Sequence, residues 1–240
     1  YKDTGINVTG GGKIVRLPIG HRTTKEIILT ASKIVQKSNW DDFYEKFVDE
    51  ESDTTMLDVN SKYLEKIGEY PKVFIESEYN NICSKIVEDI KIKINKGYDY
   101  SDIGILYLVK GFKNNNSKQL NIFTSNEQYF DYITPLKNIL SGNDIDYFWL
   151  SENQESKDSY DQFRHNVTIS SIFSAKGLEF EVLYIIGLEQ FPWELRNERE
   201  NASLLYVAMT RAKNILNIYS LIETKTTTEI KAIINELKNI

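Results

Sequence analysis

A lysine and a glycine stand between two apolar runs in the segment SIFSAKGLEFEVLYIIG, residues 171–187. Lys176 and Gly177 follow the first apolar run, and Glu179 stands shortly before the second. Lysine carries a positive charge, and glycine allows a sharp turn and a close approach of the backbone to a ligand. An ordinary surface loop does not require this order of residues. The pattern favours a nucleotide site at the edge of a β-sheet.

A fixed positive charge follows the apolar positions of a later segment, ASLLYVAMTRAKNILNIYS. The spacing predicts a helix near 200–212, in which Arg211 lies seven residues after Leu204, on or beside the apolar face. Burying an arginine there is costly unless it meets an anion. The anion could belong to a ligand across a seam between domains, or to a nearby carboxylate such as Glu198 or Glu200.

Apolar periodicity predicts strands alternating with helices along the chain. Strands are expected near 14–19, 72–77, 102–109, 145–150, 167–172, 182–187 and 214–220, and further helices near 24–37, 77–97 and 126–141 and from 226 onward. This alternation is typical of an α/β layer with a mostly parallel sheet. The continuous apolar run 182–186 indicates a strand that is covered on both faces.

Capping residues define two of these helices. Thr23 and Glu26 have the spacing of a capping box, which predicts a helix that begins near Thr24. Ser77 is expected to cap the next helix, and Gly97 to close it.

Composition limits the kind of protein this is. The 240 residues carry a net charge of −6 and 41% hydrophobic residues, which argues against a polybasic nucleic-acid or membrane binder. The apolar runs are too short to span a membrane. Cys83 is the single cysteine, so no disulfide framework can form, and a reducing, cytoplasmic location fits best. His21 and His165 stand far apart, which makes a zinc site improbable, and no metal site is expected.

The chain is expected to form a single domain over residues 1–240. Residues 38–70 are acidic and irregular and are predicted to form a surface excursion, and residues 151–165 are predicted to be a linker. The glycine-rich TGGGK at 9–13 is not a phosphate loop, because Ile14 follows its lysine and Asn7 occupies the place of the first glycine. No glycine fingerprint of a dinucleotide-binding domain follows any strand.

Three ordered segments resemble motifs of one family. SAKGLEF (174–180) and LLYVAMTRAK (204–213) resemble motifs V and VI of the UvrD/Rep-type superfamily 1 DNA helicases, and GHRTTKEI (20–27) resembles motif IV, which is usually closer to NYRSTKEI. The motifs span nearly the whole chain in the family's order. Such helicases consist of two RecA-like domains that hold ATP between them. The resemblance therefore implies the C-terminal, second RecA-like domain, which lacks a phosphate loop of its own.

The resemblance also implies roles for particular residues. Arg22 and Arg211 match the two arginines that approach the γ-phosphate of ATP. Glu179 matches the glutamate that contacts the sugar of the nucleotide, and Lys176 and Gly177 match the turn that places it. The phosphate loop and the ligands of Mg are expected on an N-terminal RecA-like domain of the same parent chain.

Contact with single-stranded DNA is implied for two further residues, Ser171 and Phe173. Phe173 could stack a base or fill the end of the sheet. The chain departs from the family pattern here, because a histidine usually stands at this position. Motif IV has Gly20-His21 where Asn-Tyr is usual, and Ala202-Ser203 replace two arginines before motif VI. Larger relatives also insert an accessory subdomain where this chain has residues 151–165.

The expected function is that of the C-terminal motor domain of an ATP-dependent DNA helicase or translocase. The alternative is a helicase-like scaffold that binds nucleic acid or protein without hydrolysis, which predicts loss of the γ-phosphate arginines. Arg22 and Arg211 are both present, which favours the motor. On its own, the chain is expected to be inactive in ATP hydrolysis and, because of its net negative charge, to bind single strands weakly.

Overall fold

The computed structural model describes residues 23–37, 66–113, 129–161, 164–191 and 197–239. Six strands form one sheet in the order β1-β8-β7-β2-β6-β5, and every neighbouring pair is parallel. The strands are β1 (Lys72–Ile75), β2 (Ile103–Tyr107), β5 (Tyr147–Trp149), β6 (Val167–Ser171), β7 (Phe180–Ile186) and β8 (Ala212–Ser220). The predicted α/β fold with a parallel sheet flanked by helices is confirmed.

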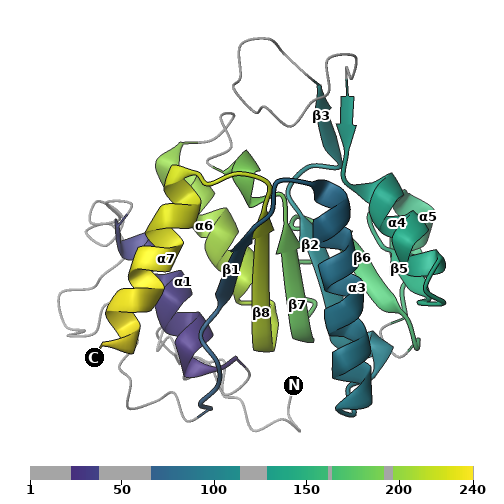
Figure 1. Ribbon diagram of the computed structural model, residues 1–240, viewed down its shortest axis with the longest axis horizontal. Coiled ribbons are helices and arrows are strands. Elements are labelled where there is room, and N and C mark those ends of the chain that lie inside the picture. The colour runs from purple at the N-terminus through teal and green to yellow at the C-terminus, as the bar shows by residue number, and fades with distance from the viewer. Residues whose placement is uncertain (1–22, 38–65, 114–128, 162–163, 192–196, 240) are drawn as a thin grey trace, which may run out of the picture.

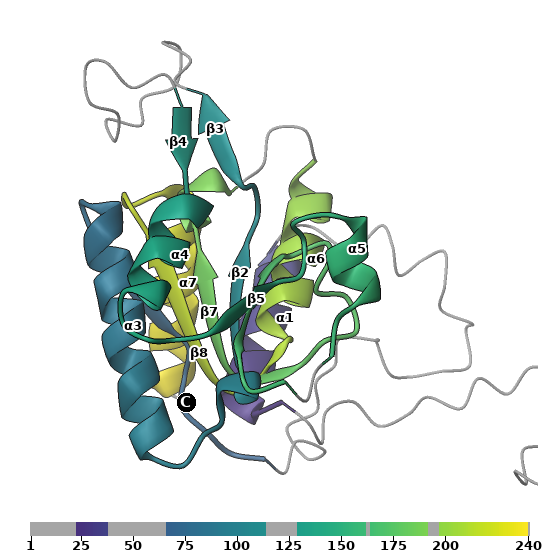
Figure 2. The ribbon, with the colours of Figure 1, turned by 90° about the vertical axis from the view of Figure 1, so that its right-hand side faces the viewer.

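Helices cover both faces of this sheet (Figure 1; Figure 2). One face carries α3 (Tyr79–Asn95) and α4 (Ile133–Ser141), and the other carries α1 (Lys25–Lys37), α6 (Glu198–Met209) and α7 (Lys225–Lys238). Short 3-10 helices, η2 (Tyr100–Asp102) and η3 (Leu188–Gln190), precede β2 and follow β7.

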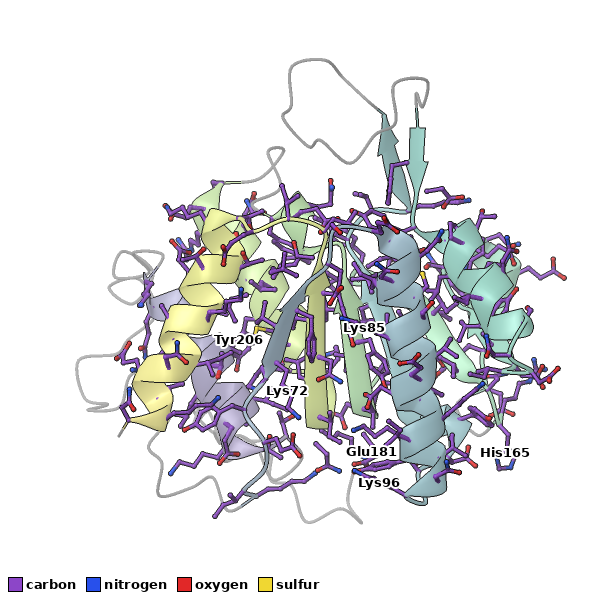
Figure 3. All side chains as sticks on the ribbon, in the orientation of Figure 1. Lys72, Lys85, Lys96, His165, Glu181 and Tyr206 are labelled. Atoms are coloured by element: carbon purple, nitrogen blue, oxygen red, sulfur yellow. The ribbon has the colours of Figure 1, made fainter. Side chains whose placement is uncertain are left out.

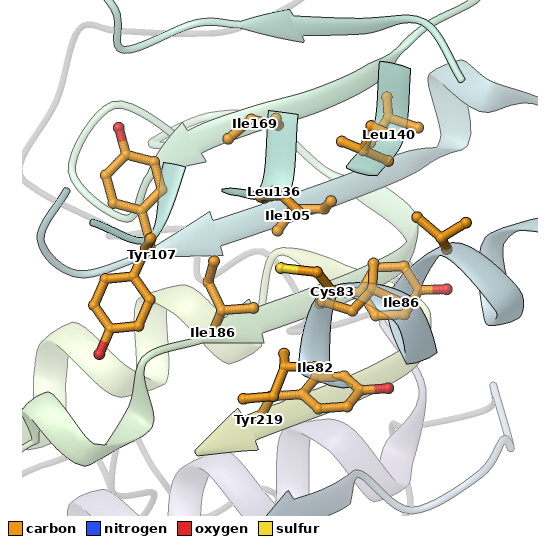
Figure 4. Close-up of a cluster of buried hydrophobic side chains, with 14 of the residues drawn as sticks. Ile82, Cys83, Ile86, Ile105, Tyr107, Leu136, Leu140, Ile169, Ile186 and Tyr219 are labelled. Carbon is orange, nitrogen blue, oxygen red and sulfur yellow. The ribbon is translucent and has the colours of Figure 1, made fainter. Parts of the chain in front are cut away.

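Strand β7 is buried on both sides, as its apolar run predicted. Tyr184 and Ile186 belong to the hydrophobic cluster beneath α3 and α4, whereas Leu183 and Ile185 belong to the cluster beneath α1, α6 and α7. Figure 4 shows the first of these clusters, in which side chains of α3 and α4 meet those of β2, β6, β7 and β8. Burying each such side chain stabilises the fold by about 1.5–3 kcal/mol.

A glycine on β2 allows an aromatic ring to lie against the sheet. A Cβ atom added at Gly104 would stand 2.5 Å from Cδ2 and 2.6 Å from Cγ of Phe180, which is itself fully buried. We expect Gly104→Ala to lower the free energy of unfolding by about 1–3 kcal/mol, because the ring has no free space to enter. Urea unfolding monitored by circular dichroism measures this. In a Phe180→Leu background the same substitution should cost clearly less, and an undiminished cost would contradict the steric explanation.

The predicted helix at 126–141 is wrong in its first part. Tyr129–Asp131 forms a strand, β4, which pairs antiparallel with β3 (Gly111–Lys113). This hairpin projects beyond the carboxyl ends of the main strands (Figure 1; Figure 2). The helix begins only at Ile133, whose backbone N–H donates to Asp131 Oδ1 at 2.8 Å. The aspartate side chain thus marks the helix start that periodicity placed too early.

Two further expectations about elements are corrected. Glu78, not Ser77, is the N-cap residue of α3, and its side chain makes no capping bond. Within the expected linker 151–165, residues Gln154–Asp158 form a short helix, α5, because Asn153 Oδ1 accepts a hydrogen bond from Ser156 N at 2.8 Å. The expected strand at 14–19, and most of the acidic segment 38–70, lie outside the described residues.

Candidate functional site

Segments that are far apart in sequence meet at the amino ends of β7 and β8. The backbone N–H of Phe180, the first residue of β7, donates to the carbonyl of Arg211 at 2.9 Å. The N–H of Thr24, just before α1, donates to the carbonyl of Lys213 at 3.0 Å. The start of α1, the end of segment 171–179 and the turn between α6 and β8 therefore lie together at one edge of the sheet. These are the parts of the chain that the three motifs marked.

Arg211 lies in the turn after α6, not on the helix as predicted, because α6 ends at Met209. Its Nε donates to the carbonyl of Val207 at 3.0 Å, and its Nη1 donates to the carbonyl of Leu178 at 3.3 Å. The side chain is half-buried. The first bond closes the end of the helix, and the second ties the guanidinium to the loop that carries Gly177 and Glu179.

The guanidinium keeps donors for a further partner. Arginine has five N–H donors, of which two are used by the carbonyls of Val207 and Leu178. Among the described residues, no carboxylate forms an ion pair with Arg211, and Glu200 instead accepts from Asn197 N at the opposite end of α6. The described residues therefore do not contain the predicted alternative, an ion pair of Arg211 with Glu198 or Glu200. Burial raises the pKa of the Tyr206 phenol, and the positive charge of Arg211 offsets part of that rise.

The loop before β7 needs its glycine for conformation. Gly177 has φ +87°, in the left-handed region that favours glycine, and a Cβ at this position would meet open space. Glycine is therefore needed here for the backbone conformation and not to avoid a clash. Lys176 and Glu179 are both exposed on either side of this turn. The structure thus brings together Lys176, Gly177, Glu179 and Arg211, through the bond between Arg211 and Leu178.

Ser171 and Phe173 lie at the other end of the sheet. Ser171 aligns with Tyr107 of β2, and Tyr107 aligns with Ile186 of β7. Ile186 stands six residues beyond Phe180, which is about 20 Å along a strand. Segment 171–179 therefore runs from the carboxyl ends of the strands back to their amino ends, so the candidate residues occupy two edges and not one.

Phe173 is half-buried and packs against the hydrophobic cluster beneath α1 and α6. Arg22 lies outside the described residues. Two residues later in the chain, Thr24 is buried, and Glu26 in the first turn of α1 accepts a hydrogen bond from Gly68 N at 2.7 Å. The glutamate therefore holds a neighbouring segment instead of closing the capping box expected with Thr23.

The amino edge also carries an ion pair between Lys213 and Glu181, and Figure 3 shows Glu181 at the lower end of the sheet. Glu181 accepts hydrogen bonds from Lys213 and Asn214 of β8. Sequence reasoning missed the chain of hydrogen bonds at the opposite edge, in which Ser171 N donates to Ser151 Oγ, Ser151 Oγ bonds to the Tyr107 hydroxyl, and Trp149 Nε1 donates to that hydroxyl. No local pattern marks them, because they come from different strands.

No group of three or more His, Cys, Asp or Glu side chains among the described residues is arranged to hold a metal ion. No described helix has both the length and the apolar character needed to cross a membrane.

Comparisons with known proteins agree with the motifs. Residues 114–223 match the family model of the UvrD-like helicase C-terminal domain. A protein named "Probable DNA helicase II homolog" from Mycoplasma pneumoniae is 37% identical over 82 residues, which are 30% of this chain and 12% of that protein. The chain therefore matches only a small part of that relative's length.

The fold has a solved counterpart. The crystal structure of the C-terminal domain of a possible DNA helicase from Lactobacillus plantarum WCFS1 is similar, with a TM-score of 0.52 and 13% sequence identity, over 89% of this chain and 97% of that chain. The resemblance to UvrD-like helicases that the motifs predicted is confirmed.

Proposed function

From the match of residues 114–223 to the UvrD-like helicase C-terminal domain, we propose that this chain is the second motor domain of an ATP-dependent DNA helicase or translocase. The observation that carries the proposal is the meeting of the three motif segments at the amino ends of β7 and β8. There, Arg211 is held by two backbone carbonyls, and within the described ranges its other three N–H donors make no hydrogen bond, so they can meet an anion.

The residues of this edge suit the phosphate end of a nucleotide. The carbonyls of Val207 and Leu178 fix the guanidinium, so little conformational entropy is lost when it meets a phosphate. Phosphoryl transfer spreads negative charge over the transferred group, and an arginine aimed at that charge stabilises the transition state. ATP would supply the phosphoryl group, and Mg, held by residues of the N-terminal motor domain, would neutralise charge on its phosphates. Arg22 is proposed to act beside Arg211.

The sugar end of the nucleotide is assigned to the loop before β7. Glu179 is exposed and follows the glycine turn by two residues, so its carboxylate can accept hydrogen bonds from ribose hydroxyls. Gly177 sets the direction of this part of the loop through its positive φ. Lys176 adds a positive charge on the other side of the same turn.

Segment 171–179 gives the proposed motor a direct connection between its two edges. One end bonds to Ser151 and Tyr107 at the carboxyl ends of the strands, and the other end bonds to Arg211. If closure of the cleft between domains moves Arg211, its bond to the carbonyl of Leu178 would pull on segment 171–179. Because that segment is continuous, the movement would be passed to its other end. ATP hydrolysis at one edge is thereby linked to a DNA strand at the other.

The test compares ATP turnover by this chain alone with turnover by the parent protein that carries both motor domains. Because the phosphate loop and the Mg ligands are assigned to the other domain, we expect turnover by the parent and none above background by the chain alone. Phosphate release in a coupled assay, with and without single-stranded DNA, measures both. Turnover by the chain alone that is abolished by Arg211→Ala would contradict the shared site. A parent that binds ATP without turnover would point to the scaffold instead.

A further inference from the structure

The start of α1 is held by parts of the chain that lie far from it in the sequence. The N–H groups at the start of a helix have no partner within the helix itself. Here Thr24 N donates to the carbonyl of Lys213 at 3.0 Å, and Lys25 N donates to the carbonyl of Lys66 at 2.8 Å. Backbone carbonyls of two other segments thus satisfy these donors and fix where the helix begins.

Glu26, in the first turn of α1, carries a buried carboxylate. It is only 8% exposed, and its Oε2 accepts a hydrogen bond from Gly68 N at 2.7 Å. Burying a carboxylate costs free energy unless hydrogen bonds compensate. An exposed glutamate would also interact favourably with the helix dipole, so helix stability alone does not explain the burial. The bond indicates that Glu26 holds α1 against the segment that contains Gly68.

Gly68 brings these two segments into direct contact. A Cβ atom added at Gly68 would stand 2.4 Å from Cγ2 and 2.9 Å from Cβ of Thr24, which is itself buried. Glycine therefore permits a close approach of the backbone that a side chain would prevent. We call Thr24, Lys25 and Glu26, together with Lys66 and Gly68, the α1 anchor.

The α1 anchor borders the edge of the sheet that carries Arg211. Lys213, whose carbonyl accepts from Thr24 N, stands two residues after Arg211. The ammonium group of Lys213 pairs with Glu181 of β7, so this part of β8 is held in turn by the sheet. Arg22 stands two residues before Thr24, and two residues span at most about 7 Å of extended chain. Within that reach, the α1 anchor determines where Arg22 can stand relative to Arg211.

We propose that Glu26 is a positioning residue that holds Arg22 in place relative to Arg211. The inference rests on the proposed function, in which both guanidinium groups meet the phosphates of one nucleotide. A misplacement of about 1 Å near the reacting atoms can lower a rate about 10²-fold. Without the carboxylate, Gly68 N loses its acceptor, and the first turn of α1 is released from this segment. Glu26 acts through the arginine and does not contact the nucleotide. Gly68 lies outside all three motif segments.

The first test is steady-state ATP turnover by the parent protein. Glu26→Ala should lower kcat about 10- to 100-fold and change KM by less than about threefold, because the arginine is needed most in the transition state. Glu26→Gln should keep kcat within about threefold of wild type, since its amide oxygen can still accept from Gly68 N. Glu236→Ala is the matched control. It breaks the ion pair with Lys33, further along α1, and should leave kcat unchanged.

A double-mutant cycle separates the positioning of Arg22 from general stability. If Glu26 acts through Arg22, Glu26→Ala should lower kcat less than about twofold when Arg22 is already alanine. A role in stability alone would lower kcat by the same factor in both backgrounds. Hydrogen exchange of this chain adds a readout that needs no catalysis. The amide of Gly68 should exchange at least about tenfold faster in Glu26→Ala than in wild type or in Glu236→Ala.

The inference is overturned if Glu26→Ala leaves kcat unchanged, or if it lowers kcat by the same factor with and without Arg22. It is also overturned if Glu26→Gln is as slow as Glu26→Ala, or if the amide of Gly68 exchanges no faster. Failure of the proposed function is distinguishable from these results. A wild-type parent without ATP turnover would overturn that function and with it any role of Glu26 in catalysis, while faster exchange at Gly68 would still show the α1 anchor.

Discussion

Replacing Arg211 with alanine in the parent protein is expected to lower kcat for ATP hydrolysis by about 10³-fold or more, as removal of an arginine from a phosphoryl-transfer site does. The three N–H donors not used by Val207 and Leu178 are the groups lost to the transition state. Phosphoryl transfer spreads charge over the transferred group in the transition state, to which the fixed guanidinium is matched, so kcat should fall far more than KM rises. Steady-state phosphate release at saturating single-stranded DNA measures the effect.

Controls separate this role from a structural one. Arg211 also closes the end of α6, so Arg211→Ala should lower the free energy of unfolding only by about 1 kcal/mol, as measured by urea. Arg211→Lys keeps a charge but not the fixed fork, and should recover only part of the activity. Arg164→Ala, at an exposed arginine beside Phe148, should leave kcat unchanged. Turnover by Arg211→Ala within threefold of wild type would refute the assignment.

The central part of the fold was predictable because burial leaves a periodic trace in the sequence. The run 182–186 has no charged residue and is apolar at successive positions, which is typical of a strand that is covered on both faces. The error at 126–141 has a different cause. Tyr129–Asp131 forms a strand because it pairs with residues 111–113, and this tertiary contact overrides the local sequence preference. The start of α4 also depends on one side-chain hydrogen bond, from Ile133 N to Asp131 Oδ1, which apolar periodicity does not reveal.

The candidate site was predictable where one residue type determines the chemistry. Gly177 marks a turn with positive φ, and Arg211 marks a charge with no carboxylate partner in the described part of the chain, so both could be singled out in the sequence. The partners of Arg211 could not, because they are backbone carbonyls and carry no residue signature. The separation of Ser171 from Arg211 depends on strand register, which is a property of the assembled sheet.

The partners of Glu189 could not be predicted either, since they come from two segments that are far from it in the sequence. Only 7% of this residue is exposed, just beyond the end of β7. Its carboxylate accepts hydrogen bonds from the hydroxyl of Tyr132, from Ser220 Oγ at 3.1 Å and from Leu221 N at 3.0 Å. Tyr132 in turn precedes α4, and its carbonyl accepts from the hydroxyl of Tyr79 at 2.6 Å. One carboxylate thus joins the ends of β7 and β8 to the base of the β3–β4 hairpin.

Removing this carboxylate is expected to have the largest effect on stability. Glu189→Ala should lower the free energy of unfolding by about 3–5 kcal/mol, because it leaves the buried donors of Tyr132 and Leu221 without acceptors and opens a cavity. Ser220 keeps the carbonyl of Ile222 as a partner at 2.7 Å. Urea unfolding of the chain measures the change. A loss below 1 kcal/mol would mean that water or a shift of Tyr132 replaces the carboxylate.

Glu189→Gln isolates the contribution of titration, because the amide keeps the size of the side chain and one of its two acceptor oxygens but cannot ionise. Burial raises the pKa of Glu189 above its ordinary value of 4.5, so its carboxyl group is most favourable to folding when protonated. That contribution is fully present below the unfolded pKa and is lost as pH rises through the raised folded value. Glutamine keeps the shape and does not titrate. The stability of Glu189→Gln relative to wild type should therefore increase as pH rises from about 4.5. A difference that stays constant with pH would show that the carboxyl group has the same pKa in the folded and unfolded chain.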